Sequence, residues 1–200
     1  MNSVKIKIND RQKKRCVDFA EARAKDSGLY EKRGAFKIED LIAGAMGEIA
    51  VWKYLRARGF SKVSKPDFAI YEKGSKSYDA DIRANGKHIH VKSQTRESEK
   101  RYGPSWIMQR HDPCLQKIQY NHYLIPCVVD IGSNTIEIFG AIGLKQIIEG
   151  GHIGELRVPH LRATKVAIYF DTLKELDYNA RWRFFTKYSD ETVDKRMVKR

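Results

Sequence analysis

The sequence predicts a mixed α/β fold in which a central β-sheet is flanked by helices. Three observations lead to this prediction: an apolar stripe at helical spacing in residues 38–59, two alternating segments on either side of Asn85–Gly86, and apolar or alternating runs at 122–142 and 165–170. Helical and strand patterns that alternate along one chain favour a sheet covered by helices.

Composition limits the size of the fold and the nature of its partners. A chain of 200 residues with 42% hydrophobic content can bury one sizeable core, so residues 1–200 are expected to form a single domain. The formal charge of +13 favours a polyanionic partner, DNA first and RNA second, although ribosomal-type binding or an anionic membrane surface would also use it. No signal peptide or long apolar run is present, which predicts a cytoplasmic protein with no membrane partner.

Both ends of the chain are basic. Asp10 is a plausible N-cap for a helix through Lys25, and Val17, Ala20 and Ala24 give this helix a thin apolar face. Its basic start can lie on phosphates or simply be solvated. The basic tail at 195–200 is expected to fray.

Residues 38–59 are predicted to form a helix that carries an acid on its apolar side. At about 100° per residue, Glu48 falls in the middle of the stripe, where a carboxylate is costly unless a cation or a metal ion meets it. An arginine partner, or a helix rotated from this position, would also account for Glu48. Gly44 and Gly47 indicate close approach of another backbone. The stripe consists of Leu41, Ala45, Trp52 and Leu55.

Residues 78–95 are predicted to form a hairpin around a two-residue type I′ turn at Asn85–Gly86. Ala84 then pairs with Lys87, and side-chain alternation gathers polar groups on one face and apolar groups on the other. The polar face holds Asp79, Asp81, His90, Lys92 and Gln94. The apolar face holds Tyr78, Ala80, Ile82, Ile89 and Val91.

This polar face suits phosphodiester hydrolysis. Carboxylates can hold a divalent metal ion, the ion lowers the pKa of a bound water, and a nearby lysine can orient that water or offset developing charge. A solvated outer face of an antiparallel pair is the alternative. Asp67, in a predicted strand at 66–71, ranks third as a metal-binding aspartate after Asp81 and Asp79.

The remaining segments complete the sheet. Residues 95–103 form a loop or helix start whose basic groups can grip a DNA backbone. Strands are expected at 122–131, 135–142 and 165–170, and a short helix at 144–149. Pro126 argues for an edge position or a bulge. The candidate nucleic-acid contacts are Arg96, Lys100, Arg101 and Arg110. The three cysteines, Cys16, Cys114 and Cys127, have neither disulfide parity nor zinc spacing and are expected to be reduced and partly buried.

Three segments in this order resemble the PD-(D/E)XK nucleases: residues 44–51 with Glu48, residues 78–82 with Asp81, and residues 89–94 with Lys92. The resemblance implies a restriction-endonuclease-like fold and a site that binds Mg²⁺ or Mn²⁺. It implies that Asp81 binds the metal, that Lys92 is the motif lysine, that Glu48 joins the site from the helix, and that the Val91 carbonyl is a further ligand.

His90 departs from this family, which usually has Glu, Asp or sometimes Gln two residues before the lysine. Three interpretations follow: His90 ligates a metal such as manganese, Asp79 supplies the missing charge, or cleavage has been lost. We favour a site that still cleaves, in which Asp79 or Glu48 helps to bind the metal ion and Gln94 orients its neighbours.

The sequence therefore predicts a metal-dependent DNA endonuclease of the restriction, homing or structure-specific type. Double-strand cleavage with one active site per chain would imply a homodimer. The alternative is a basic DNA- or RNA-binding protein that keeps the fold without cleaving.

Overall fold

A computed structural model describes residues 3–26, 36–71, 80–116, 120–157, 162–173, 176 and 178–186. Tyr78, Asp79 and the tail at 195–200 lie outside the described residues, so the predictions for them stay predictions.

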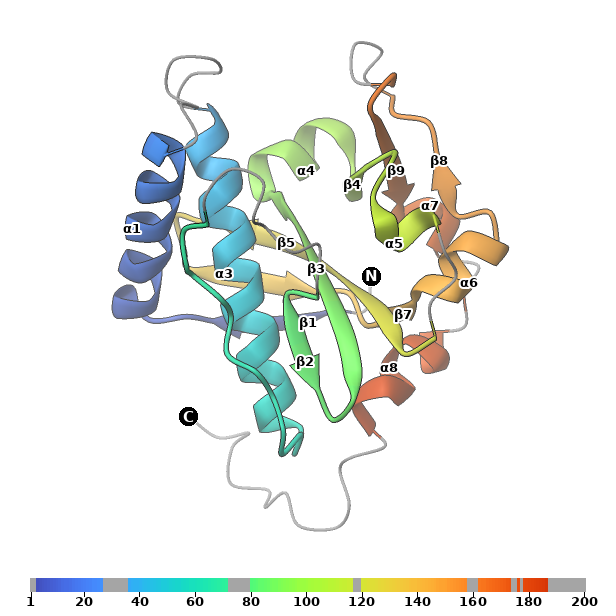
Figure 1. Cartoon of the computed structure of the whole chain (residues 1–200), viewed down its shortest axis with the longest axis horizontal. Helices are drawn as coiled ribbons and strands as arrows, with labels where there is room; N and C mark the ends of the chain where they lie inside the picture. The colour runs from blue at the N-terminus through green and yellow to red at the C-terminus, as the bar shows by residue number, and fades with distance from the viewer. Residues whose placement is uncertain are drawn as a thin grey trace.

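The larger of two sheets is mixed and central, which confirms the predicted fold class (Figure 1). Its parallel pair is β3 with β5, and its other pairs are antiparallel. Its strands, in spatial order, are β1 (Val4–Lys7), β6 (Thr135–Ile138), β5 (His122–Asp130), β3 (Lys87–Thr95) and β2 (Ile82–Ala84), with β7 (Ile142–Gly143) also paired to β5.

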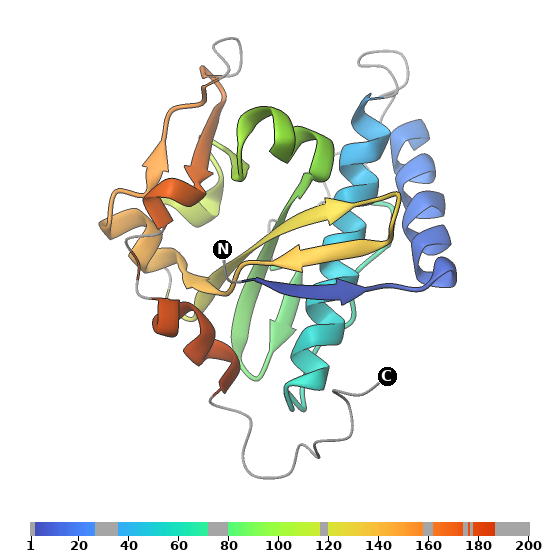
Figure 2. The ribbon, with the colours of Figure 1, turned by 180° about the vertical axis from the view of Figure 1, so that it is seen from behind.

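Two apolar cores lie on opposite faces of β5. Ile125, Cys127 and Val129 belong to the core under α1 (Asp10–Asp26) and α3 (Phe36–Ala57), whereas Leu124 and Val128 belong to the other. This division follows from the alternation of side chains along a strand. Viewed from behind, α1 and α3 lie together on one side and the second core on the other (Figure 2).

The second core is built on a three-stranded sheet of β4 (Ser105–Gln109), β9 (Lys165–Tyr169) and β8 (Ile153–Gly154). Three short helices accompany it: α5 (Pro113–Gln116), α6 (Leu144–Glu149) and α7 (Phe170–Leu173). The other helices are α4 (Arg96–Tyr102), which follows β3, and α8 (Tyr178–Thr186). None of the described helices combines the length and the apolar composition needed to cross a membrane.

The start of α1 corrects the predicted cap. Asn9, rather than Asp10, makes the reciprocal bonds of a capping box: its Oδ1 accepts from the Gln12 amide, and its own amide donates to Gln12 Oε1. The Asp10 carboxylate instead accepts a hydrogen bond from Asn134 Nδ2, which joins the helix to the β5–β6 turn.

The predicted hairpin register is confirmed where β2 and β3 pair. Ala84 lies opposite Lys87, and Asn85 and Gly86 have φ values of 47° and 77°, as a type I′ turn requires. Ile82 and Ile89 are register partners and are fully buried in the core under α3.

The predicted strand at 66–71 is wrong. The chain pairs with β2 only through an isolated bridge between Val63 and Ala84, and it then leaves the sheet. Phe68 packs on α1 instead, with its ring stacked on Phe19 at 4.9 Å. Asp67 accepts hydrogen bonds from the Ala69 amide and the Tyr71 hydroxyl, so its carboxylate caps a local turn.

Pro126 is not at an edge, because β5 has β3 on one side and β6 and β7 on the other. The alternative prediction was a bulge, and the regular pairing is interrupted at this point. β6 pairs with Cys127 onward, β7 pairs with Tyr123 and Leu124, and between them the Phe139 amide donates to the Pro126 carbonyl at 3.1 Å. Pro126, which has no N–H to donate, therefore lies at the break between the two ladders.

Gly47 and Gly44, both predicted to allow close approach, differ in the structure. A Cβ on Gly47 would lie 2.1 Å from Ser93 Oγ and 3.4 Å from Val91 Cγ1, whereas a Cβ on Gly44 would have no heavy atom within 4 Å. α3 thus packs closely on β3 at Gly47, where its neighbours are the side chains of Ser93 and Val91 rather than backbone atoms.

We predict opposite effects of alanine at these two glycines. Gly44→Ala should stabilise the protein by up to about 1 kcal/mol through helix propensity. Gly47→Ala should destabilise it by about 1–3 kcal/mol through overpacking. Adding Ser93→Ala should recover most of that loss, because it removes the nearest atom. Urea unfolding checks all three, and equal effects of the two single changes would contradict the packing described.

Candidate functional site

Three residues of the predicted polar face lie on one side of β3. Gln94 hydrogen-bonds the Gly103 carbonyl and the Ser105 amide, and His90 contacts Cys114. Lys92 shares this side by alternation, and its charge acts on His90. Gln94 is buried, so it ties β3 to the start of β4.

The charges of Asp81 and Lys92 both act on Cys114. Asp81 Oδ2 accepts a hydrogen bond of 2.7 Å from the Val91 amide, which fixes the carboxylate against β3. Burial raises the pKa of Cys114 to about 12, and the nearby Asp112 adds to this effect. Lys92 lowers that pKa and Asp81 raises it, so both charges lie within electrostatic reach of one thiol.

Glu48 lies on α3, next to the glycine that seats the helix on β3. Burial raises the pKa of Cys16 on α1 to about 12, and the negative charge of Glu48 contributes to the shift. The charge of Glu48 thus acts across to α1. Its role as a metal ligand stays a prediction.

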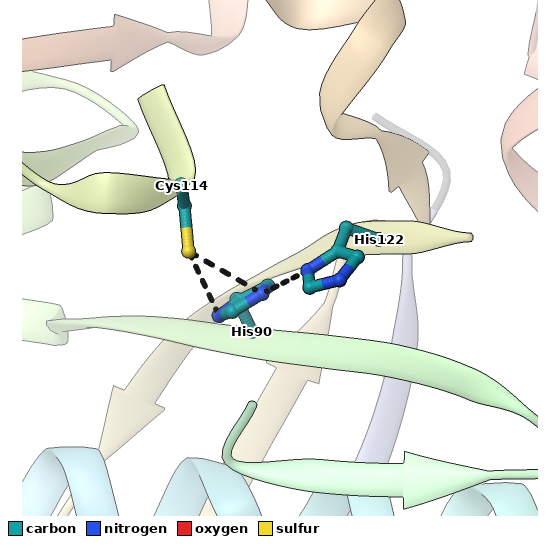
Figure 3. Close-up of side chains that lie close together, drawn as sticks. All are labelled: His90, Cys114 and His122. Carbon is teal, nitrogen blue, oxygen red and sulfur yellow. Dashed lines mark hydrogen bonds between the residues drawn. The ribbon is translucent and has the colours of Figure 1, made fainter. Parts of the chain in front are cut away.

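His90 belongs to a compact group with Cys114 and His122 (Figure 3). His90 Nε2 is 3.0 Å from His122 Nδ1, and Cys114 Sγ is 3.5 Å from His90 Nε2 and 3.7 Å from its Nδ1. One ligand atom from each residue lies within 4.8 Å of the others, so the group can hold a metal ion.

Burial sets the protonation of His90, which is 5% exposed. Desolvation, with the charge of Lys92 and then His122, lowers the pKa of His90 to about 4. The imidazole is therefore neutral at neutral pH, which is the form that binds metals.

The three side chains are placed by three separate elements. His90 lies in β3, His122 begins β5, and Cys114 lies in α5. The His122 ring stacks on its register partner His88 with centroids 4.4 Å apart and an interplanar angle of 2°. Asp112 Oδ1 accepts from the Cys114 amide at 3.0 Å and so fixes the start of α5.

The sequence interpretation missed Cys114 and His122 as possible ligands. The cysteines are free and buried as predicted, but one of them joins two histidines in space. No short zinc spacing contains this trio, because a parallel strand pair and a loop bring it together.

Of the four predicted nucleic-acid contacts, two are exposed and two bond to other residues of the protein. Lys100 and Arg101 are exposed on α4. Arg96 is ion-paired with Glu99 at 3.1 Å and with Glu137 at 2.6 Å, and Arg110 donates to the Arg162 carbonyl at 2.7 Å. Arg96 and Arg110 thus stabilise the fold, and DNA contact by any of the four stays a prediction.

We predict that Glu137 stabilises the fold in a pH-dependent way. Burial opposes its ionisation, but hydrogen bonds from Ser3 and Arg96 outweigh burial and hold its pKa below the ordinary 4.5. The stabilisation is therefore complete above about pH 4.5 and is lost as the pH falls through the lower, folded-state pKa.

Glu137→Gln should cost about 1–2 kcal/mol at pH 7, and the difference from the unmutated protein should shrink toward pH 3. Chemical unfolding at both pH values measures this. Glu149→Gln is the control, because its ion pair with Lys145 is exposed. A cost for Glu137→Gln that did not change with pH would count against the assignment.

Comparisons with protein-family models, with curated proteins and with solved structures found no match. The functional case rests on the residues themselves, above all on Asp81, Lys92 and the group of His90, Cys114 and His122.

Proposed function

We propose that this protein is a metal-dependent endonuclease that hydrolyses phosphodiester bonds in DNA, with Asp81 and Lys92 at its reaction centre. The observation that carries the proposal is the hydrogen bond of 2.7 Å from the Val91 amide to Asp81 Oδ2, which places a carboxylate beside the residue that precedes Lys92 in β3. A carboxylate for a divalent ion and an ammonium for a phosphate are groups that such a hydrolysis uses.

The hydrogen bond from the Val91 amide supports a prepared site. It holds Asp81 Oδ2 in place before any ligand arrives, so the carboxylate does not have to be ordered during the reaction. Among the described strands, β2 pairs only with Lys87 to Ile89, so the rest of that edge of β3 has no strand partner there. We propose that a phosphate backbone approaches along this edge, next to Lys92.

A hard cation at this edge would need oxygen donors. Asp81 and Glu48, with the Val91 carbonyl, would hold Mg²⁺ or Mn²⁺, because both ions prefer carboxylate and carbonyl ligands. When bound, such an ion lowers the pKa of a coordinated water and offsets phosphate charge. Lys92 would orient the attacking water or stabilise charge on the phosphate. His90 is left out of this set because its ring faces Cys114 and His122.

The overall charge supports a nucleic-acid substrate. A formal charge of +13 over 200 residues attracts a phosphate backbone before any specific contact forms. The exposed Lys100 and Arg101 follow β3 directly on α4, close in sequence to Lys92. DNA is the first substrate to test, and RNA the second.

A supercoiled-plasmid nicking assay tests this function. With Mg²⁺ or Mn²⁺ we expect nicked or linear product, and Asp81→Asn or Lys92→Ala should each lower the rate at least about a hundredfold. Asparagine is chosen because its carbonyl can still accept from the Val91 amide. Lys62→Ala, which removes an equal charge from an exposed position, should keep the rate.

The rival function is a nucleic-acid-binding protein that does not cleave. The orientation of His90 favours it, because the position that usually carries the second acid holds a neutral ring turned into a buried group. Salt-sensitive DNA binding without cleavage under either metal would establish this rival and refute the nuclease.

A further inference from the structure

We propose that His90, Cys114 and His122 bind a zinc-class divalent ion, at a site separate from any Mg²⁺ or Mn²⁺ held by Asp81. This proposal does not depend on DNA cleavage. It starts from three ligand atoms that lie within 4.8 Å of one another and come from β3, α5 and β5.

Two of the three donor separations are close to those around a tetrahedral ion. With Zn–N bonds of about 2.0–2.1 Å and a Zn–S bond of about 2.3 Å, tetrahedral angles put N and S about 3.5 Å apart and two nitrogens about 3.3 Å apart. The observed separations are 3.5 Å from Cys114 Sγ to His90 Nε2 and 3.0 Å from His90 Nε2 to His122 Nδ1.

The donor types select the metal. Two imidazole nitrogens and one thiolate sulfur suit Zn²⁺ and its spectroscopic substitute Co²⁺, whereas Mg²⁺ prefers oxygen. Binding replaces the thiol S–H bond of Cys114 with a metal–sulfur bond, and the proton leaves to solvent. Both imidazoles bind in their neutral form.

Once Cys114 is a thiolate, the charges around the group leave a negative balance for a divalent ion, although the positive charge of Lys92 also acts on His90 and Cys114. The Cys114 thiolate and the Asp112 carboxylate supply two negative charges, and Asp112 acts electrostatically on both His90 and Cys114. Among the described residues the group has three members and Asp112 is outside it, which would leave a fourth coordination position for water or a small ligand. Three protein ligands with one open position are typical of zinc sites that do more than hold a fold.

The surroundings hold the ligands in place without the metal. The His88 ring stacks on the His122 ring, and Asp112 Oδ1 accepts a hydrogen bond from the Cys114 amide. Ligands oriented by neighbouring groups lose less freedom on binding an ion. The bound ion would join α5 to both parallel strands, and so link the two cores.

In the alternative, the trio is only a hydrogen-bonded cluster. One imidazole N–H then donates to the other ring, and the thiol contacts His90. The two possibilities differ in whether the full chain takes up a stoichiometric ion with a thiolate ligand.

Titration of the chelator-treated full-length protein with Co²⁺ separates them. We expect one equivalent to bind, with a thiolate-to-cobalt absorption band and visible bands of tetrahedral intensity. Zn²⁺ should abolish these bands, and millimolar Mg²⁺ should not. At a hundredfold excess over its dissociation constant, Zn²⁺ should raise the melting temperature by about 5–10 °C.

Cysteine variants identify the ligand. The chain has three cysteines, so Cys16→Ala with Cys127→Ala leaves Cys114 alone, and the thiolate band should persist. Cys114→Ser or His122→Asn should weaken Co²⁺ binding at least tenfold. The double variant decides the matter even if Cys114→Ser does not fold. Failure to bind stoichiometric Co²⁺, or a band that vanishes in the double variant, would overturn the proposal whatever the nuclease assay shows.

Discussion

The parallel pairing of β3 with β5 is the interaction on which the rest of this structure depends. Its register puts His88 opposite His122 and His90 opposite Leu124, so the histidines of two distant segments meet at one end of the pair. The same pairing separates the two cores, because successive side chains of β5 enter opposite ones. A shift by one residue would exchange the faces and would bury Lys92 under α3.

The two proposed metal sites would lie near one strand. The carboxylate of Asp81 is fixed at the edge of β3 by the Val91 amide. Nitrogen and sulfur donors gather on the face turned toward α5. Cys114 is related to both groups. The charges of Asp81 and Lys92 act on its thiol, and the thiol contacts His90. His90, at the position where the resemblance implies an acid, would be a ligand of the proposed zinc-class site.

The sequence predicted the features that residues close together in the chain determine. Asn85–Gly86 favours one turn type, that turn fixes the register of the hairpin, and alternation then assigns its faces. The helix over 38–59 was found to within two residues at each end, because its apolar repeat is long. Contacts between distant segments were not predictable in this way. The strand at 66–71 failed because Phe68 packs on α1, and Cys114 was missed because its partners come from other elements.

Anomalous diffraction from crystals soaked separately in Zn²⁺ and Mn²⁺ would test the two-site account most directly. The account predicts a zinc peak about 2.0–2.3 Å from ligand atoms of His90, Cys114 and His122, and a manganese peak on the carboxylate of Asp81. Both metals at a single position, or neither metal near β3, would contradict it.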